Sequence, residues 1–314
     1  MGKHGRSDNT GRFAAIDVGS NTVRALAAEL VSDGRLQVFA DAFKMTALGR
    51  GLSQGGGMPS EAIAETADFV AGFLESCGRL DEVYCVGTAA AREAGNTAQL
   101  HEALEMRAGL ELTVLSGAEE ARLTFLGAIS SVGNIRGQVP LVADVGGRST
   151  ELAVGAGEEV RVASVILGAR GITEEYLHSD PPGRGELMAA RRAVNAALSE
   201  HDDLLAAADV YVAAGGTACS AGLLAGNIWD LSLRRLQQMR WELCIMPLRE
   251  RRRALAFDPP RAEVICGGLV ILELIAAASP ARRMHISIGG IREGILLANT
   301  GARKILGRQP DGAL

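Results

Sequence analysis

The chain has 314 residues, 47% of them hydrophobic, which is enough for a large core and predicts a globular protein of two domains. Its formal net charge of -5 excludes a general attraction to nucleic acid or to an acidic membrane, so an anionic partner would need a local site. The basic N-terminal segment leads into no apolar signal region, and no run of about 18 apolar residues follows, so we expect neither export nor membrane insertion. Five widely spaced cysteines without a Cys-x-x-Cys pair predict reduced thiols and a cytoplasmic location.

The first half of the chain is predicted to alternate between strands and helices. Its opening consists of consecutive strands, which is typical of an α/β domain. The stretch GRGLSQGGGMP at 49–59 predicts a loop, because its glycines and closing proline are incompatible with regular structure. Strands are expected at about 13–18, 22–31, 35–44, 82–90 and 111–117, and helices at about 60–77, 91–109 and 118–129.

The second half repeats this opening pattern and then changes character. After the repeated strands, the region from 172 to about 280 is predicted to be mostly helical. A final strand and a helix from about Gly290 close the chain. The strands are expected at 140–147, 149–155, 160–170 and 283–290.

The repeat itself is centred on two aspartates. Asp17 and Asp144 each end an apolar run and precede a small turn and a second strand, 127 positions apart (144 − 17 = 127). Each copy predicts a β-hairpin whose turn exposes backbone N–H groups beside a carboxylate, and Gly19, Gly146 and Gly147 would let the main chain approach a ligand closely. Two such turns facing each other across a cleft would clamp a phosphate chain from both sides. The alternative is a pair of ordinary glycine turns without a ligand.

Seven short blocks carry a resemblance to a known family. On these blocks the chain resembles the exopolyphosphatase and guanosine pentaphosphate phosphohydrolase family (Ppx/GppA), within the actin, sugar-kinase and Hsp70-like superfold. The blocks are DVGSNTVR at 17–24, GTAAAREAGN at 87–96, LSGAEEARL at 115–123, DVGGRSTE at 144–151, LGARGITEEYL at 167–177, AAGGTA at 213–218 and GGIREG at 289–294.

The resemblance implies a fold and a domain organisation. The fold is α/β, with two actin-like (ASKHA, ribonuclease H-like) domains and a cleft between them. The first domain would cover 1–130 and be joined by a C-terminal helix at about 291–314, and the second would cover 131–290 with helical insertions. The resemblance also implies a homodimer, in a short form without the HD-type C-terminal domain of longer relatives.

Phosphoanhydride hydrolysis requires charge neutralisation, in-line positioning and a base that orients water. A Mg²⁺ ion would bind Asp144 and Asp17, because this hard cation favours carboxylate and water oxygens. By its resemblance to a family position, Glu151 would lie near the metal and the water. The two turns would bind phosphate oxygens through Gly19, Ser20, Asn21, Thr22, Gly146, Gly147, Arg148, Ser149 and Thr150.

The catalytic carboxylate is expected in the block SGAEEA. The resemblance places it at Glu120, with Glu119 as the alternative, and the position where a strand meets a helix would point this side chain into the cleft. Without the resemblance, both glutamates could simply complement the helix dipole. Arg92, at the start of another helix, would clamp a phosphate bidentately.

Two departures from the family pattern bear on activity. The family usually reads DIGGGST at the second turn, where this chain has Arg148 in place of the third glycine. Because arginine is bulky and resists positive φ, Arg148 would either crowd the phosphate pocket or add a cation to it. Further along, Glu263 stands where the family has an aspartate. Either change could narrow or abolish activity.

Three functions from different classes remain open on the sequence. The first is a Mg²⁺-dependent phosphohydrolase that releases terminal phosphate from inorganic polyphosphate, with short chains favoured, or from guanosine pentaphosphate. The second is an ATP-dependent kinase of the same superfold, with AAGGTA at 213–218 near the nucleotide. The third is a non-catalytic polyphosphate or alarmone-binding protein. The superfold does not decide among them, because function depends on the site.

Overall fold

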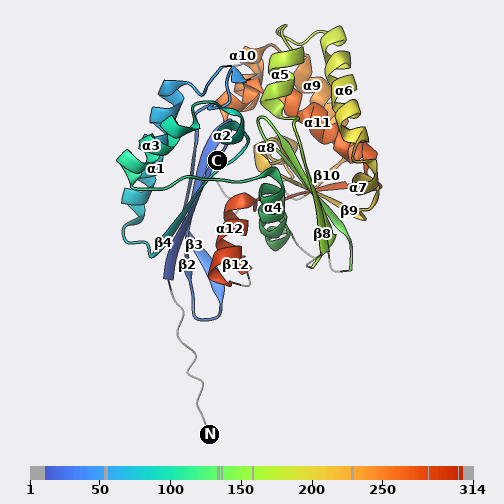
Figure 1. Ribbon diagram of the computed structural model, residues 1–314. Helices are drawn as coiled ribbons and strands as arrows, with labels where there is room; N and C mark the ends of the chain where they lie inside the picture. Colours follow the sequence, from blue (N-terminus) through green and yellow to red (C-terminus); the bar gives the residue numbers. More distant parts are fainter. Residues whose placement is uncertain are drawn as a thin grey trace.

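A computed structural model of the protein describes residues 11–52, 56–132, 135, 137–157, 159–227, 230–281, 283–302 and 304–306. The chain forms two six-stranded sheets, each with its own helices (Figure 1). The first sheet has the strand order β12-β3-β2-β1-β4-β5. Its strands are β1 (Gly11–Val18), β2 (Thr22–Leu30), β3 (Arg35–Met45), β4 (Glu82–Gly87), β5 (Thr113–Val114) and β12 (Lys304–Leu306), and the first half also contains α1 (Ser60–Cys77), α2 (Ala89–Glu93) and α3 (Thr97–Ala108).

The second sheet has the order β10-β11-β9-β6-β7-β8. Its strands are β6 (Pro140–Val145), β7 (Thr150–Ala156), β8 (Glu159–Val165), β9 (Val210–Ala214), β10 (Asp230–Ser232) and β11 (Arg283–Ile286). The accompanying helices are α5 (Ala169–Tyr176), α6 (Arg184–Ser199), α7 (Asp202–Ala206), α8 (Gly215–Ala225), α9 (Leu233–Cys244), α10 (Leu248–Ala254), the 3₁₀ helix Pro259–Glu263 and α11 (Ile265–Ala278).

The two halves are duplicates in topology and in register. In each sheet the first strand of the repeat pairs antiparallel with the next strand and parallel with a later one: β1 with β2 and β4, and β6 with β7 and β9. Asp17 lies opposite Arg24, and Asp144 lies opposite Glu151, so both cross-strand pairs are related by the same 127-residue offset (144 − 17 and 151 − 24). The predicted pair of like-folded α/β domains is confirmed, whereas their exact boundaries stay a prediction.

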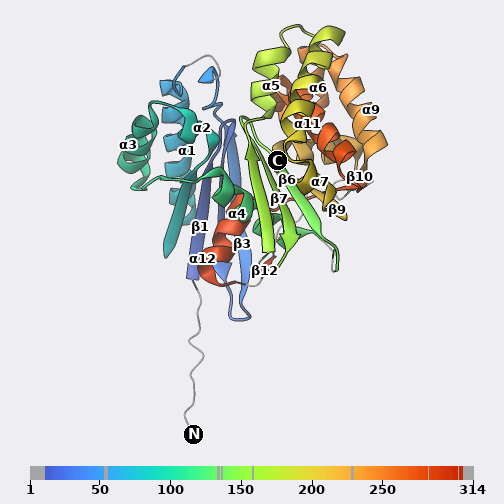
Figure 2. The ribbon, with the colours of Figure 1, turned by 45° about the vertical axis from the view of Figure 1, so that its right-hand side comes forward.

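Two helices form a layer between the sheets (Figures 1 and 2). One is α4 (Gly117–Ser131), whose Ala121 and Phe125 pack with buried residues of the second sheet. The other is α12 (Ile291–Thr300), whose Ile295 packs with residues of β1 and β2. The helices meet at glycines, since a Cβ on Gly127 would lie 1.9 Å from the carbonyl oxygen of Gly290. Only residues without side chains allow two helix backbones this close.

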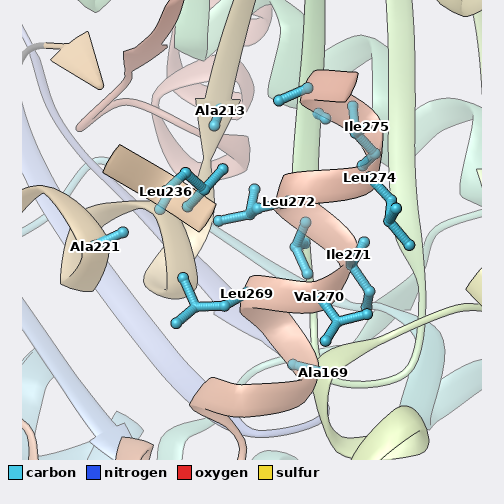
Figure 3. Packing of buried hydrophobic residues seen from close by; sticks show 14 of the residues in the cluster. Ala169, Ala213, Ala221, Leu236, Leu269, Val270, Ile271, Leu272, Leu274 and Ile275 are labelled. Carbon is cyan, nitrogen blue, oxygen red and sulfur yellow. The ribbon is translucent and has the colours of Figure 1, made fainter. Parts of the chain in front are cut away.

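The core of the second half is built around α11 (Figure 3). Its residues from Ile265 to Ala276 are buried on all sides, including Leu269, Ile271 and Leu272 at 0% exposure, as expected for a helix that is apolar around its whole circumference. The exception is Glu273, a buried carboxylate that accepts hydrogen bonds from Arg191 of α6 at 2.7 Å and from Arg240 of α9. A buried carboxylate with two arginine partners ties three helices together.

Several predicted elements differ from the structure. The strand predicted at 82–90 ends at Gly87, and the helix predicted at 91–109 is interrupted between α2 and α3 around Gly95. The region predicted to be helical contains β9, whose five residues are all buried, because a run this short and flanked by Asp209 and Gly215 suits a central parallel strand. The closing helix ends at Thr300 and is followed by β12, and the predicted residues beyond 306 lie outside the described part. No helix among the described residues has the length and apolar character needed to cross a membrane.

Candidate active site

The two glycine turns have the same local structure. The backbone N–H of Gly19 donates to the carbonyl oxygen of Thr22 at 3.2 Å, and that of Gly146 donates to the carbonyl oxygen of Ser149 at 3.0 Å. A Cβ on Gly19 would lie 2.8 Å from the Thr22 oxygen, and one on Gly146 would lie 3.0 Å from the Ser149 oxygen. The glycines are therefore required because of close backbone packing within each turn.

Both turns open into one cavity between the halves, of about 100 Å³. This is room for several water molecules, or for phosphoryl groups of similar size. The carboxylates of both sheets and the first turn of α4 reach the same space. The predicted site residues that line it are Asp17, Gly19, Ser20, Asn21, Thr22, Glu120, Asp144, Gly146, Gly147, Ser149 and Glu151.

Acidic side chains are concentrated in this cavity. Burial raises the pKa of Asp17 to about 6, and the nearby Asp144 carboxylate adds to the shift, although Arg24 opposes it. Burial also raises the pKa of Asp144. Burial and repulsion by Glu151 raise the pKa of Glu120, whereas burial and repulsion by Asp144 raise the pKa of Glu151. The site therefore holds its carboxylates at a cost in free energy that a bound cation would reduce.

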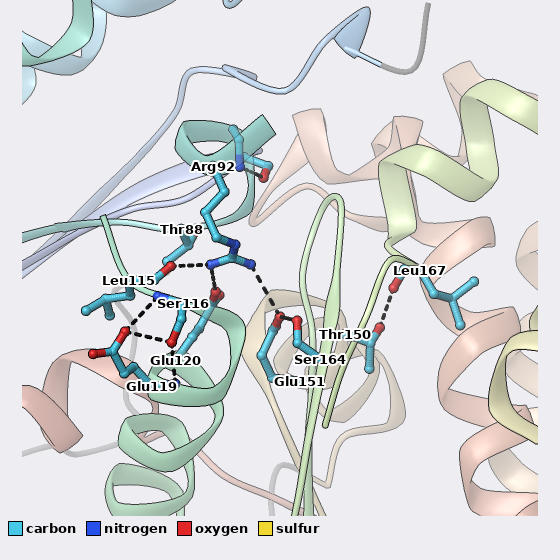
Figure 4. A network of polar contacts seen from close by, with 12 residues as sticks. Thr88, Arg92, Leu115, Ser116, Glu119, Glu120, Thr150, Glu151, Ser164 and Leu167 are labelled. Atoms are coloured by element: carbon cyan, nitrogen blue, oxygen red, sulfur yellow. Dashed lines mark hydrogen bonds and ion pairs between the residues drawn. The ribbon is translucent and has the colours of Figure 1, made fainter. Parts of the chain in front are cut away.

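Arg92 lies behind the acidic cluster and holds two of its members (Figure 4). Its guanidinium donates to Glu120 Oε2 at 2.7 Å and to the carbonyl oxygen of Leu115 at 2.8 Å. Its other terminal nitrogen lies 4.0 Å from Glu151 Oε1, which also accepts a hydrogen bond from Ser164 at 3.0 Å. Arg92 is not among the residues lining the cavity, and its guanidinium contacts the carboxylates of Glu120 and Glu151. Its role as a phosphate clamp stays a prediction.

Glu119 faces away from the cavity because it caps its own helix. Its carboxylate accepts hydrogen bonds from the backbone and hydroxyl groups of Ser116 at 2.8 and 2.7 Å, while its own N–H donates to the Ser116 hydroxyl at 3.2 Å. This reciprocal capping box lowers the pKa of Glu119 through the hydrogen bond from the Ser116 side chain. Of the two adjacent glutamates, only Glu120 reaches the cavity.

Arg148 and Thr150, which were predicted to bind phosphate, have protein partners in this structure. Arg148 does not have a positive φ, and its guanidinium donates to Glu93 Oε2 from Nε at 3.1 Å and from Nη2 at 2.8 Å. It therefore neither crowds the cavity nor lines it. The hydroxyl of Thr150 donates to the carbonyl oxygen of Leu167, so it faces the interior. Neither side chain lines the cavity, and their phosphate-binding roles stay predictions.

Asn21 lines the cavity, but its side chain already has partners. Its Oδ1 accepts hydrogen bonds from Arg170 of α5, at 2.9 Å from Nε, and its amide nitrogen lies 3.6 Å from the Met45 sulfur. The first turn is thus tied to the second half of the chain through this side chain.

Three arginines that line the cavity, Arg24, Arg261 and Arg292, were not predicted as site residues. Arg24 belongs to the block DVGSNTVR, and the hairpin register places it opposite Asp17, a pairing that a predicted two-strand register could have found. Arg261 follows the Pro-Pro pair near the end of the helical insertion. Arg261 Nε donates a hydrogen bond to Asp258 Oδ2 at 3.0 Å. The Arg261 guanidinium also covers Gly216, because a Cβ added to this glycine would lie 2.4 Å from Arg261 Nη2.

The carboxylates in the cavity are suitable ligands for Mg²⁺, although the described residues do not form a complete metal site. Among the described residues, no group of three or more His, Cys, Asp and Glu side chains is arranged to hold a metal. However, Asp17 Oδ1 is buried and has no hydrogen-bond partner, and Asp144 lies close enough to affect its pKa. Mg²⁺ usually binds through one or two carboxylates, with water and substrate phosphates completing its coordination. Asp17 and Asp144 fit this mode.

Two duplicated α/β halves with two phosphate-type turns and a shared acidic cavity define a member of the actin-like superfold. Within it, the chain belongs to the Ppx/GppA phosphatase family, whose model matches residues 28–302. It is 33% identical over 318 residues to "Exopolyphosphatase 2" of Mycobacterium tuberculosis, covering 92% of this chain and 99% of that protein.

Solved structures agree with this assignment. The crystal structure of an exopolyphosphatase-like protein has a TM-score of 0.85 at 25% identity, covering 92% of this chain and 98% of that one. The crystal structure of the Ppx/GppA family member from Aquifex aeolicus has a TM-score of 0.75 at 26% identity, covering 92% of this chain and 97% of that one.

Proposed function

We propose that this chain is a Mg²⁺-dependent phosphohydrolase that releases terminal orthophosphate from inorganic polyphosphate, with short chains favoured and guanosine pentaphosphate as a second candidate substrate. The observation that carries the proposal is the cavity in which two equivalent glycine turns face the Glu120 carboxylate. The relative named as an exopolyphosphatase, which this chain matches over nearly its whole length, supports the same reaction.

In this mechanism the turns bind the substrate and the glutamate acts on water. Backbone N–H groups and the hydroxyls of Ser20 and Ser149 would donate to phosphate oxygens. Arg24 and Arg261 would supply positive charge along the cavity wall. Asp17 and Asp144 would hold Mg²⁺, which supplies charge neutralisation at the phosphoryl oxygens when bound.

Glu120 would orient and deprotonate the attacking water. It reaches the cavity and is fixed by Arg92 at 2.7 Å. Burial and the Glu151 carboxylate raise its pKa, and the positive charge of Mg²⁺ at Asp17 and Asp144 would lower this pKa again, so that Glu120 is ionised and can accept a proton. Glu151, held by Ser164, would assist in placing the water. Because a loose phosphoryl transition state needs little covalent help, this positioning would supply most of the catalysis.

The kinase alternative is less well supported. The turn at Gly215 and Gly216 was its candidate nucleotide site, but the guanidinium of Arg261 covers Gly216 and leaves no room there even for a methyl group. A guanidinium at this position could pair with the oxygens of a phosphate chain. We retain the non-catalytic binding protein as the outcome expected if the wild-type protein binds polyphosphate but does not hydrolyse it.

We also propose that the protein is a cytoplasmic homodimer, as the family resemblance implies. All five cysteines lie in the described part of the chain and none forms a disulfide there, which is compatible with a reducing compartment. Light scattering coupled to size-exclusion chromatography would give twice the 32.8 kDa chain mass, and a single-chain mass would contradict the dimer.

The test compares wild type with Glu120→Gln and the matched variant Glu119→Gln. Orthophosphate release is measured with short polyphosphate, long polyphosphate and guanosine pentaphosphate, with and without Mg²⁺. Glu120→Gln is expected to lower kcat by roughly 10²- to 10⁴-fold, the usual contribution of a general base. Glu119→Gln is expected to remain within about threefold of wild type, because a glutamine still serves the capping box.

Each other function has its own signature. Phosphoryl transfer from ATP to an acceptor, without phosphate release from polyphosphate, would identify a kinase. Polyphosphate binding by wild type without turnover of any of the three substrates would identify a non-catalytic binding protein. Equal loss in both glutamine variants would contradict the assignment of the base to Glu120.

A further inference from the structure

The short helix α2 contacts the first glycine turn, the start of α4 and the second glycine turn. It has five residues, Ala89–Glu93, and no side-chain cap at its N-terminus, so it cannot hold its place without tertiary contacts. The N–H of Ala90 donates to the hydroxyl of Ser20 in the first turn at 3.1 Å. Arg92 holds Glu120 at the start of α4. The position of α2 therefore determines where Arg92 presents its guanidinium.

Arg148 fixes the other end of α2 from across the cavity. Two of its nitrogens donate to the same carboxylate oxygen of Glu93, the last residue of α2, at 3.1 and 2.8 Å. The arginine side chain is 8% exposed and that of Glu93 is 29% exposed, so water competes only weakly with this contact. Arg148 belongs to the second half and Glu93 to the first, which makes the ion pair a link between the halves.

The resulting path from Arg148 to Glu120 consists of direct contacts. Arg148 bonds Glu93, Glu93 is the neighbour of Arg92 in one helical turn, and Arg92 bonds Glu120. A glycine at position 148, which the family usually has there, could not make the first contact. Arg148 therefore has a structural contact that does not depend on the substrate.

We propose that Arg148 is a positioning residue that holds the Glu120 carboxylate in its reactive orientation through Glu93 and Arg92. The proposal rests on the phosphohydrolase function given above. Arg148 acts in the folded, closed arrangement of the two halves and makes no contact with the phosphate chain. It therefore affects the rate of the chemical step and leaves substrate binding almost unchanged.

The test measures kcat and KM for polyphosphate hydrolysis in Arg148→Gln, Glu93→Gln and the double variant. Each single change is expected to lower kcat by roughly 10-fold, because a small misplacement of a catalytic group is costly, while KM changes by less than about twofold. The double variant should be no slower than either single variant, since both remove the same contact. The exchanged pair Arg148→Glu with Glu93→Arg should recover most of the lost kcat.

Dependence on Glu120 separates positioning from general stabilisation. In a Glu120→Gln background, adding Arg148→Gln should reduce the residual rate by less than about twofold, because the group being positioned is already absent. The matched control is Arg161→Gln, which removes a surface ion pair of 3.1 Å with Asp203 on the second half. This control is expected to leave kcat and KM at wild-type values.

Several results would overturn the proposal. A raised KM in Arg148→Gln, with normal kinetics in Glu93→Gln, would make Arg148 a substrate-binding residue. An unchanged kcat in Glu93→Gln would break the path even if Arg148→Gln failed to fold. If wild type itself releases no phosphate, the function falls and this inference with it. If wild type is active and both single variants match it, the inference alone fails.

Discussion

Replacing Asp17 by asparagine is expected to stabilise the metal-free protein while abolishing its activity. Asp17 is buried, its Oδ1 has no hydrogen-bond partner, and its pKa is raised from 3.8 to about 6. At a pH above 6, where the side chain is ionised in both states, this difference corresponds to roughly 3 kcal/mol of lost stability. Asparagine keeps the shape and removes the charge. For a chain of this size we expect a rise in Tm of roughly 5 °C.

The pH dependence follows from the sign of the shift. The folded state keeps its proton on Asp17 to a higher pH than the unfolded state, so the destabilisation begins above pH 3.8 and is complete above about 6. Tm should therefore differ between wild type and Asp17→Asn at pH 8 in the presence of EDTA, and agree at pH 4. Added Mg²⁺ should raise Tm of wild type alone.

The matched control is Asp33→Asn, in the turn between β2 and β3. Asp33 is exposed, and its hydrogen bond with Arg35 lowers its pKa, so this replacement should not stabilise the protein at pH 8. A lower Tm for Asp17→Asn than for wild type at pH 8 without divalent cations would refute the reasoning, because the buried carboxylate would then not be a source of strain.

Further predictions concern glycines at close contacts. Gly127→Ala would place a Cβ 1.9 Å from the Gly290 oxygen and should lower the free energy of unfolding by about 3 kcal/mol, measured by urea denaturation. Its control, Gly185→Ala on the open face of α6, meets nothing within 4 Å and should change stability by at most about 1 kcal/mol, in the favourable direction. Gly216→Ala would displace the Arg261 guanidinium and should raise KM for polyphosphate by roughly 10-fold without unfolding the protein, as circular dichroism would verify. An unchanged KM would remove Arg261 from the substrate-binding set.

The duplicated hairpin was predictable because it depends on local chemistry. A strand that ends in Asp and turns through glycine has few structural solutions, and the 127-residue spacing made the two copies evidence for each other. Their hydrogen bonds, Gly19 to Thr22 and Gly146 to Ser149, are equivalent in the structure. The meeting of both turns with Glu120 in one cavity agrees with the arrangement expected from the family resemblance.

The directions of side chains were harder to predict from the sequence, because they depend on partners that are distant in the chain. Glu119 and Glu120 are adjacent and identical in type, and the Ser116 cap decides which one turns away from the cavity. Arg148 was predicted from its own turn alone, whereas its direction is set by Glu93, 55 residues earlier in the chain. The strand β9 was missed because its short apolar run is compatible with a helix until its parallel pairing with β6 is known.

The acidic cluster of the cavity consists of Asp17, Asp144, Glu120 and Glu151. The glycine contact between α4 and α12 determines which of these carboxylates would separate if the two halves moved. Glu120 is carried by α4, which packs on the sheet that bears Asp144 and Glu151, whereas Asp17 lies on the sheet against which α12 packs. Rotation about this contact would withdraw Asp17 and leave the other three carboxylates together. Like-charge repulsion then favours the separated arrangement in the absence of cations, and a cation-bound polyanion favours the assembled one. Substrate would complete the catalytic centre by joining its two parts.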